Sequence, residues 1–311
     1  MLQYLVILLD DTSIAFCHAS NPLTSKHLID KDVLKKAVLF GMKNNLMIQY
    51  VFPSYDLPQE YYDIIESIDN VKIGKDIQVY DYIPRIVSSD TIVLRIKIDD
   101  FISNIVMVSD LIKQVKRLSI SFTNIDEFYD DLISSYSNAL NSIHDELISE
   151  KKKGKNPQVN ILTDRLSLQK MSNCGAGINN ITVAPNGKFY ICPAFYYDER
   201  SGMDTNFNYK KCITDRSCGD LEIGLNIKNE SLLNLEHSPL CKLCDAYHCN
   251  RCVWLNQKLT YDINTPSHQQ CVISHIERNS SMLLSAKMRN IGVDVDVINK
   301  IDYLDPFNTF I

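Results

Sequence analysis

The chain has 311 residues, enough for about two domains of the usual ~150 residues, and its 45% hydrophobic and 23% charged residues exclude a disordered or fibrous protein. Its 32 Lys and Arg residues against 38 Asp and Glu residues give a net charge of −6, which argues against nucleic acid as a partner. The apolar run Leu5–Leu9 stops at Asp10 and Asp11, short of the ~20 apolar residues of a membrane span. We therefore expect a cytoplasmic protein that binds neither nucleic acid nor membrane.

The first 165 residues alternate short apolar runs with segments of helical period. An amphipathic helix is expected behind a cap at Asp30, a second helix near Pro58, and a long helix behind a capping box formed by Asn124 and Glu127. The predicted strands are Tyr4–Leu9, Leu46–Phe52, Val71–Val79, Thr91–Ile98, Leu118–Phe122 and Gln158–Leu162. This order predicts an α/β fold with parallel βαβ units, either an open doubly wound sheet or part of a (β/α) barrel.

From about residue 170 the chain is rich in turn signals. Asn186-Gly187 predicts a hairpin between Ile181–Val183 and Lys188–Ile191, and a helix is expected over about Ile273–Met288. The expected domains are an α/β domain over residues 1–168, a small cysteine-rich domain over 169–290 and a tail over 291–311. Cysteine-dense regions of this size often rely on metals because their own core is too small.

Nine of the ten cysteines fall between Cys174 and Cys271. In a reducing cytosol such a cluster more often holds metal than forms disulfides. The pairs Cys241/Cys244 and Cys249/Cys252 are separated by only four residues, whereas zinc knuckles usually stand ~12–20 residues apart. The spacing therefore favours iron–sulfur ligation, with zinc as the alternative.

Two resemblances follow from these residues. The pattern Cys174-x12-Gly187-x4-Cys192, then Cys241-x2-Cys244-x4-Cys249-x2-Cys252, then Cys271 resembles the SPASM domain of radical SAM peptide-modifying enzymes, whose usual form has five and three residues where this chain has four and two. Nearly the whole chain resembles the CXXX repeat peptide maturase family. That likeness rests on the segments Leu8–Ser13, Phe16–His18, Met47–Gln49, Cys249–Asn256 and Asn264–Cys271.

The SPASM resemblance implies two auxiliary [4Fe-4S] clusters. One would be bound by four cysteines, Cys241, Cys244, Cys249 and Cys271. The other would be bound by Cys174, Cys192 and Cys252, with a fourth ligand from Cys212, Cys218, a substrate thiol or water. Alternatively, Cys212 and Cys218 are ordinary free thiols. His248 and His268 flank these cysteines and are expected beside the metal rather than bound to it.

A radical SAM enzyme needs Cys-x3-Cys-x2-Cys after its first barrel strand, and this chain has only Cys17 there. We therefore expect a partial (β/α) barrel that resembles a degenerate radical SAM core, followed by a small SPASM-like domain. This core should neither hold nor cleave S-adenosylmethionine. Cys17, His18, Asp10 and Asp11 could bind a metal or activate a thiolate. The simpler interpretation is a half-buried thiol beside a turn made by the two aspartates.

These observations predict an accessory subunit in the maturation of a ribosomally made Cys-x-x-x repeat peptide. It would bind the clusters and work with a separate radical SAM peptide maturase and a Cys-rich precursor peptide, by docking the peptide, relaying electrons or coordinating a substrate thiol. The alternative is a zinc-stabilised scaffold that recruits peptide and enzyme without redox chemistry. An independent enzyme with Cys17 as nucleophile ranks last, because the adjacent His18 would point to the opposite face of an extended strand.

Overall fold

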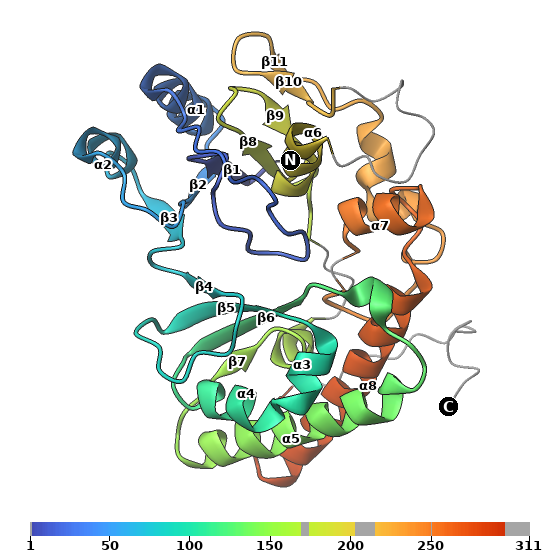
Figure 1. Cartoon of the computed structure of the whole chain (residues 1–311). Helices are drawn as coiled ribbons and strands as arrows, with labels where there is room; N and C mark the ends of the chain where they lie inside the picture. Colours follow the sequence, from blue (N-terminus) through green and yellow to red (C-terminus); the bar gives the residue numbers. More distant parts are fainter. Residues whose placement is uncertain (1, 169–173, 203–214, 250, 296–311) are drawn as a thin grey trace. The chain divides into compact units, whose positions relative to one another are not determined.

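The computed structural model describes residues 2–168, 174–202, 215–249 and 251–295. The chain forms two compact units, each built from two separate stretches of sequence (Figure 1). The first unit comprises Met1–Ile77 and Gly175–Asn234, and the second comprises Gln78–Cys174 and Leu235–Ile311. The expected domains, 1–168, 169–290 and 291–311, cut across these units and stay a prediction.

The first unit is built on a five-stranded sheet in the order β3-β2-β1-β8-β9. Its strands are β1 (Tyr4–Leu8), β2 (Met47–Val51), β3 (Asn70–Ile73), β8 (Asn180–Val183) and β9 (Phe189–Tyr190). The central strand β1 pairs in parallel with both β2 and β8, so that Leu5 lies opposite Ile48 on one side and Ile181 on the other. The pair β8 and β9 is antiparallel, which confirms the hairpin predicted from Asn186-Gly187.

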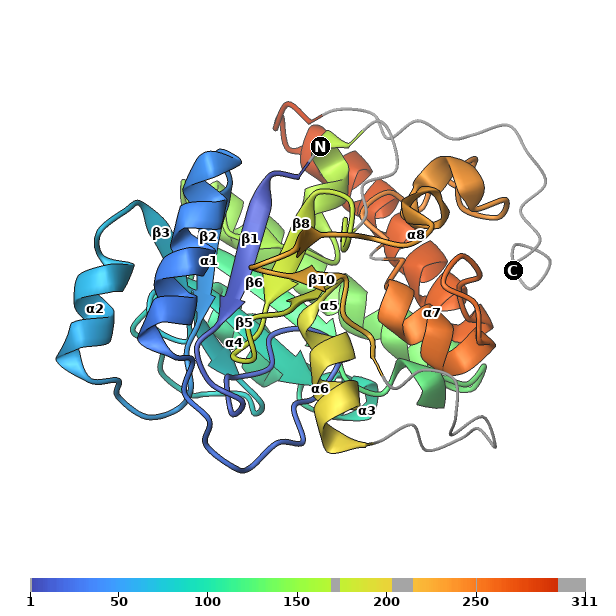
Figure 2. The ribbon, with the colours of Figure 1, turned by 90° about the horizontal axis from the view of Figure 1, so that it is seen from above.

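Helix α1 (Lys31–Lys43) has both an N-terminal cap and an apolar stripe along one face. The Asp30 carboxylate accepts a hydrogen bond from the Asp32 backbone N–H, and the buried face carries Leu34, Ala37, Val38 and Gly41. This face packs on β1 and β2, along which the helix runs in Figure 2. At Gly41 an added Cβ would lie 2.7 Å from the Ile48 side chain, so glycine allows the close approach of helix and sheet.

The remaining elements of the first unit are short. They are α2 (Gln59–Ile65), α6 (Pro193–Ser201), the strand pair β10 (Gly219–Asp220) and β11 (Gly224–Leu225), and the 3-10 helix η3 (Glu230–Leu233). The core between sheet and helices includes Tyr50, Phe52, Phe189 and Cys218.

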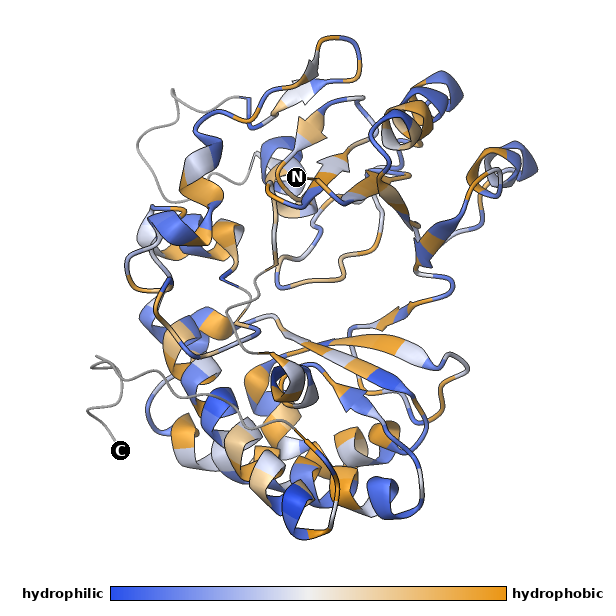
Figure 3. Ribbon diagram, turned by 180° about the vertical axis from the view of Figure 1, so that it is seen from behind, coloured by the Kyte–Doolittle hydropathy of each residue, from blue (hydrophilic) through white to orange (hydrophobic). Residues whose placement is uncertain are grey.

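The second unit is built on a four-stranded, wholly parallel sheet in the order β4-β5-β6-β7. Its strands are β4 (Gln78–Tyr80), β5 (Thr91–Ile96), β6 (Arg117–Phe122) and β7 (Gln158–Val159). Its helices are α3 (Ile98–Ser103), α4 (Ile105–Ile112), α5 (Leu132–Lys152), α7 (Val253–Thr260) and α8 (His268–Asn290), with 3-10 helices η1 (Ile125–Glu127), η2 (Thr163–Ser167) and η4 (Leu235–His237). Figure 3 shows apolar residues gathered along the strands of this sheet, where Leu94, Leu118 and Ile120 are buried.

Two local predictions were wrong. The expected strand Val71–Val79 is two strands, β3 and β4, which belong to different sheets. The break is at Gly74, whose φ of +97° directs the chain into a turn. The capping box forms only the 3-10 turn η1, where the Asn124 amide donates to the Glu127 carboxylate at 2.9 Å, and the long helix α5 begins later, at Leu132.

The α/β class with parallel sheets is therefore confirmed.

Helices α5 and α8 pack against each other in the second unit, and both appear side by side in Figure 1. No helix within the described parts of the chain is long and apolar enough to cross a membrane.

Candidate metal centre

Three of the predicted ligands lie in one tightly turned segment of the second unit, residues 238–249, here called the cysteine loop. Backbone N–H groups close three successive turns, from Cys241 to the Ser238 carbonyl, from Cys244 to the Cys241 carbonyl and from Cys249 to the Ala246 carbonyl, each at 3.0 Å. His248 has a φ of +62°, which allows the chain to reverse again just before Cys249. The loop is thus shaped by turns and not by a helix or strand.

The thiols of the cysteine loop lie close enough to influence one another. The pKa of Cys241 is raised to about 12, mainly by burial and to a smaller extent by the neighbouring Cys249 and Cys244, whereas Arg251 acts in the opposite direction. Arg251 is itself 3% exposed, and burial lowers its pKa while Cys241, Cys249 and Cys174 oppose that shift. Three cysteines therefore lie near one buried guanidinium.

Helix α8 brings the fourth predicted ligand of this set into the same region. Cys271 lies in its first turn, and His275 follows one turn later on the same face of the helix. The His275 Nε2 atom is 3.5 Å from the Cys244 Sγ atom, and the Ala246 N–H donates to the same sulfur at 3.3 Å. Of the four predicted ligands in this set, three lie in the cysteine loop and Cys271 lies on α8, a helix that contacts the loop through His275 and Cys244.

A buried ion pair fastens the cysteine loop to α8. Asp245, between two of the cysteines, pairs with Arg278, and both residues are 5% exposed. At the base of the loop, Arg251 donates to the hydroxyl of the buried Ser238. Because a buried charge without its partner is costly, these contacts fix the loop relative to the helix that carries Cys271 and His275.

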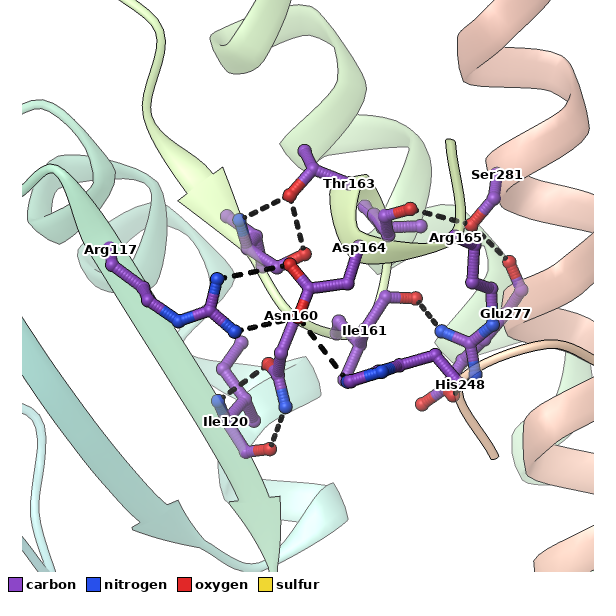
Figure 4. A network of polar contacts seen from close by, with 12 residues as sticks. Arg117, Ile120, Asn160, Ile161, Thr163, Asp164, Arg165, His248, Glu277 and Ser281 are labelled. Carbon is purple, nitrogen blue, oxygen red and sulfur yellow. Dashed lines mark hydrogen bonds and ion pairs between the residues drawn. The ribbon is translucent and has the colours of Figure 1, made fainter. Parts of the chain in front are cut away.

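Figure 4 shows a second connection, from the cysteine loop to the sheet. Asp164 on η2 accepts two hydrogen bonds from the Arg117 guanidinium, at 2.6 and 3.1 Å, and its carboxylate is 3.3 Å from the His248 Nε2 atom. Burial lowers the pKa of His248, and the Asp164 charge opposes this shift. The next residue, Arg165, pairs with Glu277 of α8 at 2.6 Å. Sheet, η2, cysteine loop and α8 are therefore joined by charged side chains.

The other predicted set is distributed over both units. Cys174 is exposed and Cys252 directly precedes α7, both in the second unit, whereas Cys192 directly precedes α6 in the first unit. Cys218 lies in the core of the first unit, where burial raises its pKa to about 11. Cys212, the other proposed fourth ligand, lies outside the described residues.

The residues after β1 form a turn that is tied to α6. Asp10 accepts from the backbone N–H of Thr12 at 2.8 Å, and its own N–H donates to the Ser13 hydroxyl at 3.0 Å. The buried Asp11 carboxylate accepts from the Tyr196 hydroxyl and from the Arg200 guanidinium at 2.9 Å, both on α6. The two carboxylates are thus used in folding the turn and in holding α6.

Cys17 and His18 follow this turn in the first unit, and both side chains are half-buried. Cys17 is the one cysteine of the chain between residues 1 and 173. The region after β1 therefore offers a single thiol.

The donor chemistry of the cysteine loop fits an iron–sulfur cluster. Thiolates are the ligands of such clusters, and hydrogen bonds to their sulfurs, as from Ala246 to Cys244, are part of how proteins tune them. Across the residues that the structure describes, no three His, Cys, Asp or Glu side chains converge on a single metal ion. A four-iron cluster needs a wider arrangement than one ion, because each of its iron atoms takes its own thiolate.

Sequence reasoning missed His275 and the ion pair of Asp245 with Arg278. The one signal for His275 was its spacing of four residues from Cys271, which becomes informative only once a helix is known to begin at His268. Asp245 and Arg278 are 33 residues apart, and no periodicity links them.

Comparison with protein-family models and with curated proteins finds no match. The resemblance to the CXXX repeat peptide maturase family therefore stays a prediction. Solved structures do match. "Native anSMEcpe with bound AdoMet" has a TM-score of 0.55 at 12% identity, covering 92% of this chain and 100% of that chain.

A second similar structure is "Native anSMEcpe with bound AdoMet and Cp18Cys peptide", with a TM-score of 0.54 at 12% identity, covering 93% of this chain and 99% of that chain. At this identity the likeness shows the fold. The chain thus shares its fold with anSMEcpe, a protein that was solved with bound AdoMet.

Proposed function

We propose that this protein is an accessory subunit in peptide maturation, which binds auxiliary [4Fe-4S] clusters and works with a separate radical SAM enzyme. The observation that carries the proposal is a contrast within one chain. Three cysteines lie in the cysteine loop and a fourth on α8, which contacts that loop, in a fold like that of a protein solved with bound AdoMet, while the turn after β1 has a single cysteine.

The turn after β1 supports the view that this chain does not start radical chemistry. A cluster that cleaves S-adenosylmethionine needs three thiolates, and Cys17 supplies one. The neighbouring Asp11 is engaged by Tyr196 and Arg200, so this carboxylate serves α6. The radical would then come from a partner enzyme.

In this proposal Cys241, Cys244, Cys249 and Cys271 hold one cluster. Bound there, the group would supply one-electron transfer, because a cysteine would ligate each of its four irons. Arg251 places a positive charge near these thiols and offsets the negative charge that they carry as thiolates. Asp245 and Arg278 keep loop and helix in register.

The second cluster is proposed for Cys174, Cys192 and Cys252, with Cys212, Cys218, a substrate thiol or water as the fourth ligand. Deprotonating Cys218 for this role is unfavourable, because its thiol lies in an apolar core and burial raises its pKa. Its deprotonation would have to be compensated by iron.

The proposed substrate is a precursor peptide with repeated Cys-x-x-x units. One solved relative in fold was determined with a bound peptide, which supports peptide binding as a use of this fold. The cysteines of such a precursor would suit an iron atom with an open coordination position.

The test is anaerobic purification of the full chain, with iron, sulfide and zinc analysis and electron paramagnetic resonance (EPR). Iron and sulfide should be present, Cys241→Ser should lower both, and the matched variant Cys17→Ser should leave both unchanged. Colourless protein with stoichiometric zinc and no iron would refute the cluster proposal.

The accessory role has its own test. Incubation with S-adenosylmethionine and dithionite should yield no 5′-deoxyadenosine. Co-expression with a radical SAM peptide maturase and a Cys-x-x-x repeat precursor, the proposed partners, should give a peptide mass shift that weakens when this chain is omitted. Release of 5′-deoxyadenosine by the purified chain alone would contradict the assignment.

A zinc-stabilised scaffold is the second candidate, and one distance favours it. A nitrogen at ~2.0 Å and a sulfur at ~2.3 Å from one tetrahedral zinc lie roughly 3.5 Å apart. The His275 Nε2 and Cys244 Sγ atoms are 3.5 Å apart. Metal analysis of the protein purified without added metal separates the two candidates.

A further inference from the structure

His275 is the polar side chain of α8 that touches a predicted ligand. Its Nε2 atom is 3.5 Å from the Cys244 Sγ atom, and the residue is 7% exposed. The ring stands one helical turn after Cys271, on a helix of 23 residues. The site around the ring is therefore closed to most solvent and set by helix geometry.

Two ion pairs hold α8, the helix that carries His275, in place. Two residues later Glu277 pairs with the buried Arg165, and three residues later Arg278 pairs with Asp245 of the cysteine loop. Since loop and helix are both fixed, the contact between ring and sulfur does not depend on a mobile side chain.

The sulfur of Cys244 has the surroundings of a tuned ligand. It accepts the Ala246 N–H at 3.3 Å, and an imidazole N–H at 3.5 Å would be a second donor. Each N–H directed at a ligand sulfur stabilises the more negative, reduced state of a cluster and so raises its reduction potential.

We propose that His275 is a positioning residue for the cluster, which donates its Nε2–H to Cys244 Sγ and raises the potential of the site formed by Cys241, Cys244, Cys249 and Cys271. The inference rests on the proposed function of the cysteine loop. In a four-iron cluster each iron takes one protein ligand, so Cys271 completes the set and the imidazole stays a donor.

The experiment compares anaerobically prepared wild type, His275→Phe and His275→Gln, with the exposed His237→Phe as matched control. Iron and sulfide are measured first. An EPR-monitored redox titration with dithionite as the one-electron donor then follows the signal that is lost in Cys241→Ser.

His275→Phe should keep its iron and sulfide but titrate at a more negative potential. His275→Gln, which retains an N–H donor, should recover part of the shift, and His237→Phe should match wild type. Pulsed EPR of reduced wild type labelled with ¹⁵N-histidine should show a ¹⁵N coupling that disappears in His275→Phe, whereas the ¹⁴N coupling of the Ala246 peptide nitrogen should remain. The ¹⁵N coupling decides the matter if His275→Phe does not fold, since its absence in wild type refutes the proposal.

An unchanged potential in His275→Phe would overturn this inference and leave the cluster intact. Loss of iron from both His275→Phe and His275→Gln, with both variants folded, would make the imidazole a ligand and also overturn it. Wild-type protein without iron would instead overturn the proposed function, and the inference with it.

Discussion

Stability between pH 7 and 5 should depend on one buried histidine of α5. His144 is fully buried, and its Nε2 atom is 2.8 Å from the Ser280 hydroxyl on α8. Burial lowers its pKa from 6.5 to about 4, with a smaller lowering by Lys287 that Asp145 opposes. The unfolded chain takes up a proton below pH ~6.5, whereas the folded chain stays neutral until about 4.

Acidification therefore favours the unfolded state. The contribution of the neutral His144 to the free energy of unfolding is full above pH ~6.5 and is lost as the pH falls towards 4. At ~1.36 kcal/mol per pH unit, the contribution lost between pH 7 and 5 is about 2 kcal/mol. Urea unfolding at both pH values would measure it. The destabilisation on acidification should be about 2 kcal/mol smaller in His144→Gln than in wild type.

The exposed His237→Gln is the matched control and should keep the wild-type pH response. An identical pH response in His144→Gln and wild type would show that the folded protein accommodates the protonated imidazole. The role assigned to burial at this position would then be refuted.

Three further predictions concern stability. Glu277→Gln should lower the free energy of unfolding by about 3 kcal/mol in urea titrations, because it leaves the 2% exposed Arg165 without its carboxylate; a change below about 1 kcal/mol would show that the pair is dispensable. Gly219→Ala should cost about 2 kcal/mol, since the residue has a φ of +99° and its Cβ would lie 2.0 Å from the Gly224 carbonyl oxygen; a wild-type melting temperature would contradict this. Removing iron from the loaded protein with a chelator should lower the melting temperature, because a ligand that binds only the folded state stabilises it; the Cys241→Ser variant, which lacks one of the two proposed clusters, should show a smaller decrease.

Several elements could be predicted where independent local signals agreed. Asp30 caps α1 and the apolar positions from Leu34 to Gly41 form one stripe, so the helix follows from sequence. The hairpin at Asn186-Gly187 follows from turn chemistry. At Val71–Val79 the apolar pattern continues through the turn at Gly74, so periodicity alone joined two strands.

The candidate site was less accessible to sequence reasoning. The cysteines themselves identify the region, but Arg251 and His275 acquire their roles only through three-dimensional packing. Arg165 and Glu277 are 112 residues apart, and a charged pair at such a distance has no local signature. Which unit a cysteine joins, as for Cys192 and Cys252, depends on the path of the chain and not on spacing.

That path has a consequence for how the protein is made. Strand β1 pairs with β8, which is synthesised more than 170 residues later. Until then β1 lacks its second neighbouring strand. The core of the second unit is completed later still, by α8, which begins at residue 268. During translation both sheets therefore expose apolar surface until late, so nascent chains truncated before residue 268 should be targets for chaperones and proteases.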